Sequence, residues 1–149
     1  MSCTGFDGKI YYATTVAAPA SATWVELALS RDVNTTMSAD EADTSDRRSA
    51  VKSKCPTMIE VETSTTLTYT NGDTTLTALR DAFLNRTQIQ VAVMDGAIAT
   101  SGSEGLVYPC HVYSNDFAQP LSDGQTVSVT FKPSATTVAN ADFQWYVVA

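Results

Sequence analysis

Apolar and polar residues alternate with a period of two along most of the chain. Successive side chains of a strand point to opposite faces, so this alternation predicts half-buried β-strands. Frequent Thr, Val and Tyr residues favour the same structure. The strands are predicted at Lys9–Thr14, Thr23–Leu29, Met58–Thr70, Gln88–Met94, Leu106–Tyr113, Thr126–Lys132 and Phe143–Val148.

One segment has helical spacing instead. Leu76, Leu79 and Phe83 recur at steps of three and four residues, which predicts a short amphipathic helix over Thr75–Asn85. Asp73, Thr74 or Thr75 could cap its first turn. Strands with one inserted helix predict a mainly β fold, an antiparallel β-sandwich or small barrel with one flanking helix. The 149 residues suit a single domain, 1–149.

The segment Arg31–Lys54 shows no sustained periodicity and is predicted to be a long, flexible loop between two strands. From Asp40 onward its acids precede its bases, an arrangement that suits head-to-tail pairing with a copy of itself or with a neighbouring subunit. A solvated loop without a partner is the alternative on composition alone. The charged candidates for assembly are Asp40, Glu41, Asp43, Asp46, Arg47, Arg48, Lys52 and Lys54.

The overall charge limits the possible partners. Sixteen acidic and nine basic residues give a net charge of −7, which argues against capture of nucleic acid or of an anionic membrane. The segment Arg31–Lys54 is neutral, so the negative charge lies in the rest of the chain. No apolar run reaches the roughly 18 residues of a membrane span, and no secretory signal is recognisable at the N-terminus.

The sequence contains no pattern typical of a catalytic, metal or cofactor site. Cys3, Cys55 and Cys110 lack the spacing of a metal or redox motif, which favours reduced thiols over a disulfide plus one free thiol. His111 is the only histidine and has no partner close in sequence. Glycine patterns of nucleotide-binding loops are absent. We therefore predict a protein that is not an enzyme and needs no cofactor.

The order of several short motifs resembles a known family. Trp24-Val25-Glu26-Leu27 precedes Glu41-Ala42-Asp43-x-Ser45-x-Arg47, and a long alternating strand follows. After it come the helical Leu76-x-x-Leu79-x-x-Ala82-Phe83 and the closing strand Val127–Pro133. From about Gly8 to Pro133 this series resembles the major tail tube proteins of long-tailed bacteriophages, especially those with non-contractile tails. The tube protein of type VI secretion is their relative.

The resemblance implies a virion protein that forms hexameric rings stacked into a tube, assembled in the bacterial host cytoplasm. DNA would pass through the lumen without specific binding. Terminator, tape measure and baseplate or tip proteins would be partners, and no membrane would be involved. In the family a long loop, here Arg31–Lys54, reaches a neighbouring ring and becomes ordered on assembly.

The resemblance also implies a lumen lined by strands that flank the long loop. The candidate lumen residues are then Glu26, Glu60 and Glu62. Carboxylates on the wall would repel the DNA backbone and leave it mobile, whereas Lys or Arg would hold phosphates by counterion release. Alternatively these glutamates lie on an outer surface and serve solubility.

A β-sandwich binding module on a larger assembly, carbohydrate-binding or adhesin-like, is the competing hypothesis. It requires exposed aromatic residues grouped on one face. The available Trp24, Tyr108, Tyr113 and Trp145 are spread along the chain.

Overall fold

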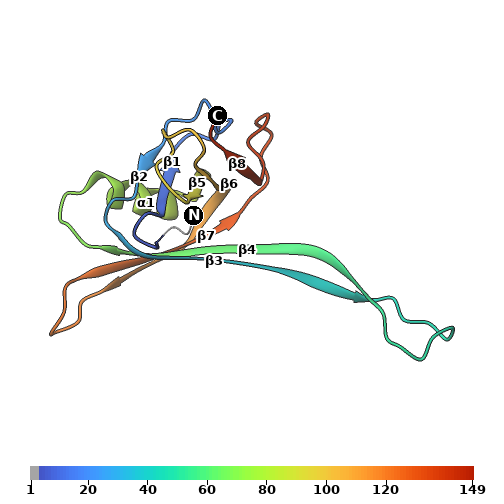
Figure 1. The fold of residues 1–149 in the computed structure, drawn as a ribbon. Helices are drawn as coiled ribbons and strands as arrows, with labels where there is room; N and C mark the ends of the chain where they lie inside the picture. The colour runs from blue at the N-terminus through green and yellow to red at the C-terminus, as the bar shows by residue number, and fades with distance from the viewer. Residues whose placement is uncertain (1–3) are drawn as a thin grey trace.

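A computed structural model describes residues 4–149, which form an antiparallel sheet of eight strands and one helix (Figure 1). The mainly β fold with one helix is as the sequence predicted. The elements in chain order are β1 (Lys9–Ala13), β2 (Val25–Glu26), β3 (Ser30–Asp43), β4 (Lys54–Thr68), α1 (Thr74–Asn85), β5 (Ile89–Met94), β6 (Glu104–Ala118), β7 (Thr126–Pro133) and β8 (Gln144–Val147).

The sheet folds over on itself at β6. The strand order is β2-β1-β5-β6-β7-β4-β3, and β8 also pairs with β6. The first half of β6 pairs with β5 and β8, whereas its second half pairs with β7. A register shift between Val112 and Ser114 interrupts β6 near this change of partner. Two layers result: β2, β1, β5, the first half of β6 and β8 form one, and the second half of β6, β7, β4 and β3 form the other.

The main core lies between these two layers. Alternate residues of both layers face it, as the period-two pattern predicted. Tyr108 of β6 is fully buried and donates a hydrogen bond of 2.5 Å to the Thr63 hydroxyl of β4, which connects the layers. The other members of this core include Ile10, Val91, Leu106, Leu67, Val129 and Phe131. A smaller cluster, with Tyr11, Ala92, Met94 and Val107, covers the outer side of the first layer.

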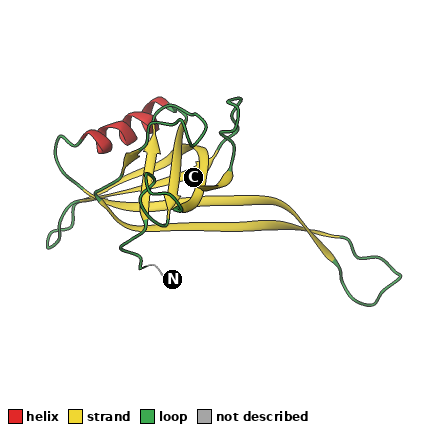
Figure 2. Ribbon diagram, turned by 45° about the horizontal axis from the view of Figure 1, so that its top comes forward, coloured by secondary structure: helices red, strands yellow, loops and turns green. Residues whose placement is uncertain are grey.

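The helix α1 covers one side of the main core (Figure 2). Its buried face includes Leu79 and Ala82. Asp73 is the N-cap, because its side chain accepts hydrogen bonds from the backbone N–H groups of Thr75 (2.9 Å) and Leu76 (3.2 Å). The helix stops at Arg86, whose φ of 56° is left-handed.

Substitution Asp73→Ala is expected to lower the free energy of unfolding by about 1 kcal/mol, because two N–H groups of the first helical turn lose their acceptor. Urea denaturation followed by circular dichroism measures this. Asp81→Ala, on the exposed side of the same helix, is the matched control and should change stability by less than about 0.5 kcal/mol. Equal effects of the two substitutions would contradict the capping role.

The structure corrects the prediction for the segment between two early strands. Arg31–Lys54 was expected to be a long loop, but β3 occupies Ser30–Asp43, and only the stretch from Thr44 to Ser53 is a loop. Most of β3 is exposed on both faces, so its sequence lacks the alternation that marks a half-buried strand. The expected strand Thr23–Leu29 is also shorter, since only Val25 and Glu26 pair with β1.

Candidate assembly surfaces

The β3–β4 hairpin extends far beyond the body of the molecule (Figure 1). β4 pairs with β7 only through Thr63–Thr68, whereas its pairing with β3 continues to Asp43 and Lys54. We call the protruding hairpin, residues 36–62, the arm. From Lys54 to Glu62 the strand advances about 26 Å at about 3.3 Å per residue. The arm is thus long enough to reach another molecule.

Large apolar side chains are exposed on the arm. Met58 is 79% exposed and Ile59 is 68% exposed, and Met37 on β3 is also exposed. Met37 pairs with Val61, and Ala39 pairs with Ile59. Exposed apolar groups gathered on one projecting element are typical of an interaction surface.

Part of the charge on the arm is neutralised internally. Lys54 forms an ion pair with Glu41 across the hairpin. Asp46 accepts hydrogen bonds from the Arg48 guanidinium at 2.9 Å and 2.5 Å, and this contact lowers the pKa of the Asp46 carboxyl. Asp43 accepts a hydrogen bond from the backbone N–H of Ser45 (2.9 Å), and hydrogen bonding to Ser45 lowers its pKa.

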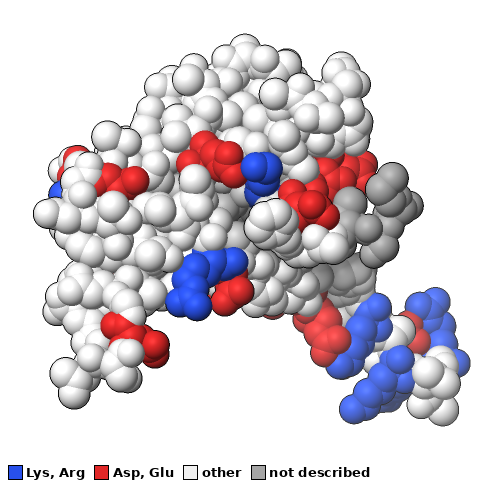
Figure 3. Space-filling view, turned by 60° about the vertical axis from the view of Figure 1, so that its left-hand side comes forward, with Lys and Arg blue, Asp and Glu red and all other residues white. Residues whose placement is uncertain are grey.

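The tip of the arm therefore presents a surplus of positive charge. Between Thr44 and Ser53 the chain has three bases and one acid, and the acid Asp46 is engaged with Arg48. Arg47 and Lys52 form no ion pair within residues 4–149, and neither does the acid Asp40 at the base of the tip. Figure 3 shows Lys and Arg gathered at this tip. The eight predicted assembly residues lie together on the arm, but several of them pair with each other.

The loop at the tip is closed by its own hydrogen bonds. The Thr44 N–H donates to the Ser53 carbonyl (3.0 Å), and the Ser53 N–H donates to the Ser45 hydroxyl (2.9 Å). The Thr44 and Ser53 hydroxyl groups also lie within 2.9 Å of each other. These hydrogen bonds link the two sides of the loop within one subunit, and its ordering on assembly stays a prediction.

A second surface, the hydroxyl face, covers the outer side of the layer formed by β3, β4, β7 and the second half of β6. Pairs such as Ser64 with Thr130 and Thr66 with Ser128 lie side by side on it. The face consists of Asn34, Thr36, Ser38, Glu60, Glu62, Ser64, Thr66, Ser114, Asp116, Thr126, Ser128, Thr130 and Lys132. Its charges are three acids and one base, and the exposed ring of Tyr113 lies on it beneath the Lys132 ammonium.

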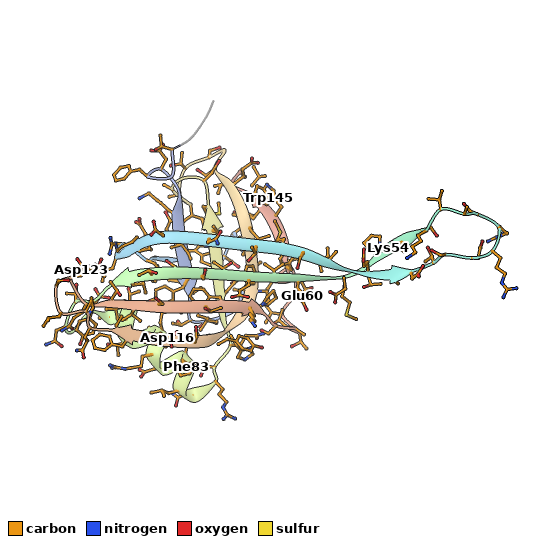
Figure 4. The ribbon with its side chains drawn as sticks, turned by 90° about the horizontal axis from the view of Figure 1, so that it is seen from below. Lys54, Glu60, Phe83, Asp116, Asp123 and Trp145 are labelled. Atoms are coloured by element: carbon orange, nitrogen blue, oxygen red, sulfur yellow. The ribbon has the colours of Figure 1, made fainter. Side chains whose placement is uncertain are left out.

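The structure brings together only two of the three candidate lumen residues. Glu60 (Figure 4) and Glu62 both lie exposed on the hydroxyl face, two residues apart on β4. Glu26 belongs to β2, at the opposite end of the strand order, and its carboxylate pairs with the Lys9 ammonium at 3.0 Å. Asp116 also lies on this face, and sequence reasoning missed it because the predicted strand ended at Tyr113.

The hydroxyl-face layer has unpaired strand edges on both sides. Within the described chain, β3 pairs only with β4. Beyond Cys110, β6 pairs with β7 alone among residues 4–149, so its opposite edge has no partner strand there. Free backbone N–H and C=O groups on an edge can pair with another chain. The layer can therefore be extended at both sides by further strands.

Other potential sites are few. Within residues 4–149, no three His, Cys, Asp or Glu side chains are grouped as metal ligands, and no helix is long and apolar enough to cross a membrane. Burial raises the pKa of the Cys110 thiol, whereas Cys55 on the arm is exposed. Cys3 lies outside the described residues.

The aromatic residues of the binding-module hypothesis do not all reach the surface. Tyr108 is in the core, and Trp24 is half-buried and donates its indole N–H to the Pro19 carbonyl at 3.0 Å. Tyr113 on β6 and Trp145 on β8 are exposed. The Tyr113 ring is covered by the Lys132 ammonium, which lies 5.2 Å from its centre.

Comparison with solved structures identifies the fold. The sequence matches no family model and no curated protein. The SPP1 tail tube protein superimposes with a TM-score of 0.74 and 14% identity, over 98% of this chain and 80% of that one. The tail of an empty gene transfer agent particle gives a TM-score of 0.70 and 14% identity, over 99% of this chain and 100% of that one. The chain therefore has the fold of phage tail tube proteins.

A native gene transfer agent virion gives a similar result, with a TM-score of 0.69 and 14% identity over 96% of this chain and 99% of that one. An Hcp protein gives a TM-score of only 0.45 with 11% identity, and this similarity is too weak to support a conclusion about the fold.

Proposed function

We propose that this protein is the structural subunit of a phage-type tail tube. Copies would join side by side into hexameric rings, and the rings would stack into a tube through which DNA passes without specific binding. The observation that carries the proposal is the four-stranded layer, because it combines two free edges with a continuous polar outer face. The shared fold with tail tube proteins supports the same function.

Ring formation follows from the free edges. An exposed edge strand is an aggregation hazard that folded proteins usually cover or pair. Pairing the β3 edge of one subunit with the β6 edge of the next satisfies both edges and repeats around a closed ring. The hydroxyl faces of all subunits then form one continuous cylindrical surface, as in other closed β-barrels.

The chemistry of the hydroxyl face suits a channel for DNA. Ser and Thr hydroxyl groups keep the wall hydrated, and the Lys132 ammonium covers the exposed ring of Tyr113. Glu60, Glu62 and Asp116 give the face a net negative charge that repels phosphates. In this proposal the wall contains Glu60 and Glu62, and Glu26 lies elsewhere on the subunit.

The arm is the stacking element in this proposal. It projects along the strand direction, and its exposed apolar residues and basic tip would be covered by a subunit of the neighbouring ring. A contact between different surfaces of two copies, when it does not close, extends into a filament. Terminator, tape measure and baseplate or tip proteins would meet the tube at its ends, in a virion tail assembled in the bacterial host cytoplasm.

Negative-stain electron microscopy of the purified protein at increasing concentration tests the proposal. Rings and long hollow tubes are the expected result. A protein that stays monomeric at all concentrations and binds glycans would contradict it and support the binding-module hypothesis.

A further inference from the structure

Two exposed apolar residues on α1 have no role in the core. The helix packs against β6, on the face of the four-stranded layer that points to the core. Figure 4 shows Phe83 near the β6 edge of this layer, whereas β3 forms the other edge. Leu84 is 66% exposed, and Phe83 is partly exposed. The charged Arg80 and Asp81 lie on the exposed surface of the same helix. This helix surface forms an apolar knob with a charged border.

A cleft of about 810 Å³ opens on the other side of the molecule, between β3 and the pair β1 and β5. The cleft reaches as far as Thr35 of β3, whose hydroxyl lies 3.1 Å from the buried Thr63 hydroxyl. The apolar lining includes Ile10, Leu27, Val33 and Val93, and the charged lining includes Asp7, Lys9, Glu26 and Arg31. The cleft thus exposes part of the core side of β3.

The geometry points to a second copy of this chain as the occupant of the cleft. This inference rests on the proposed function, in which the β3 edge of one subunit pairs with the β6 edge of the next. The helix α1 packs on the core face of β6, and the cleft opens on the core face of β3. Pairing of β3 in one subunit with β6 in the next therefore brings the knob of one subunit beside the cleft of the other. We propose that Phe83 and Leu84 of each subunit insert into the cleft of its neighbour in the same ring.

The charges on the two surfaces are complementary. The knob carries Arg80 and Asp81, and the cleft offers Asp7 as an acid and Arg31 as a base, because its Glu26 carboxylate is already paired with Lys9. The knob and the cleft are different surfaces on opposite sides of one subunit, so the contact is heterologous and can repeat around a ring. Two copies that bound each other symmetrically would form only dimers.

Disulfide cross-linking tests this contact. Cysteines are introduced as Leu84→Cys and Val33→Cys in one chain, with Cys3→Ser and Cys55→Ser to remove competing thiols. Mild oxidation of assembled tubes should give a ladder of covalent oligomers that ends at the ring size. The control combines Leu84→Cys with Val138→Cys, which is exposed outside the cleft, and should give no ladder.

The outcomes separate this inference from the proposed function. Tubes that form normally in reducing buffer but give no ladder, or only covalent dimers, would overturn the knob-and-cleft contact and leave the tube intact. Absence of any ring or tube, with the parent protein also monomeric, would overturn the proposed function itself.

A charged substitution provides an independent measurement. Leu84→Asp should raise the protein concentration required for assembly at least about tenfold, because each contact loses a buried leucine side chain. The monomer should retain its circular dichroism spectrum and melting temperature, since Leu84 is mostly exposed in the subunit. Unchanged assembly of this variant would contradict the inference.

Discussion

Replacing residues 40–58 by an Asn-Gly turn is expected to abolish tube formation and leave a folded monomer. Ala39 and Ile59 are paired across the hairpin, so a two-residue turn can close the shortened strands. The removed residues include all eight charged assembly candidates as well as Met58, and none of them is buried. The free energy of unfolding should therefore change by less than about 1 kcal/mol.

Electron microscopy measures assembly of this variant, and urea denaturation measures its stability. A matched variant replaces only residues 44–53 by Asn-Gly, since Asp43 and Lys54 are also paired. It loses the basic tip but keeps the apolar part of the arm, and it should assemble at higher protein concentration than the parent. Normal tubes from the longer truncation would show that the arm is not the stacking element.

Reversing the charge of the channel wall should slow the passage of DNA. The double substitution Glu60→Lys and Glu62→Lys removes two negative charges from the hydroxyl face of every subunit and adds two positive ones. Each lysine can hold a phosphate by releasing a counterion, so DNA ejection should become at least about tenfold slower at low salt. Higher ionic strength should relieve the effect because it screens the contacts.

Ejection from particles carrying the variant is followed with a DNA-binding dye after triggering with receptor. Asp142→Lys, an exposed reversal outside the hydroxyl face, is the control and should leave the rate unchanged. Tube length should be normal in both variants, since neither changes the exposed apolar residues or the basic tip of the arm. An ejection rate equal to that of the parent in the double variant would mean that β4 faces away from the DNA.

The predictable parts of the fold are those with one buried and one exposed face. Val127, Val129 and Phe131 alternate with hydroxyl residues, and β7 forms where this pattern predicts. The spacing of Leu76, Leu79 and Phe83 likewise predicts α1 to within one residue, although Phe83 is exposed and Ala82 is the buried residue of that turn. One face of each of these segments contacts the core, so apolar residues recur at the period of the strand or helix and can be recognised in the sequence.

The missed parts depend on contacts that the local pattern does not encode. β3 has two exposed faces over most of its length, so Asn34-Thr35-Thr36 resembles a loop. The resemblance groups Glu26 with Glu60 and Glu62 because their predicted strands flank the expected long loop, but the facing of a strand is set by its register and partners. The knob and the cleft lie at opposite edges of one layer because α1 packs at the β6 edge and β3 forms the other edge. This arrangement depends on the tertiary fold and leaves no local pattern in the sequence.

Helical reconstruction by cryo-electron microscopy of tubes grown from the purified protein tests the central claim most directly. The map should show stacked rings in which β3 of one subunit pairs with β6 of the next, with Glu60 and Glu62 pointing into the lumen. A wall lined by α1, or an assembly in which the β3 and β6 edges remain unpaired, would contradict it.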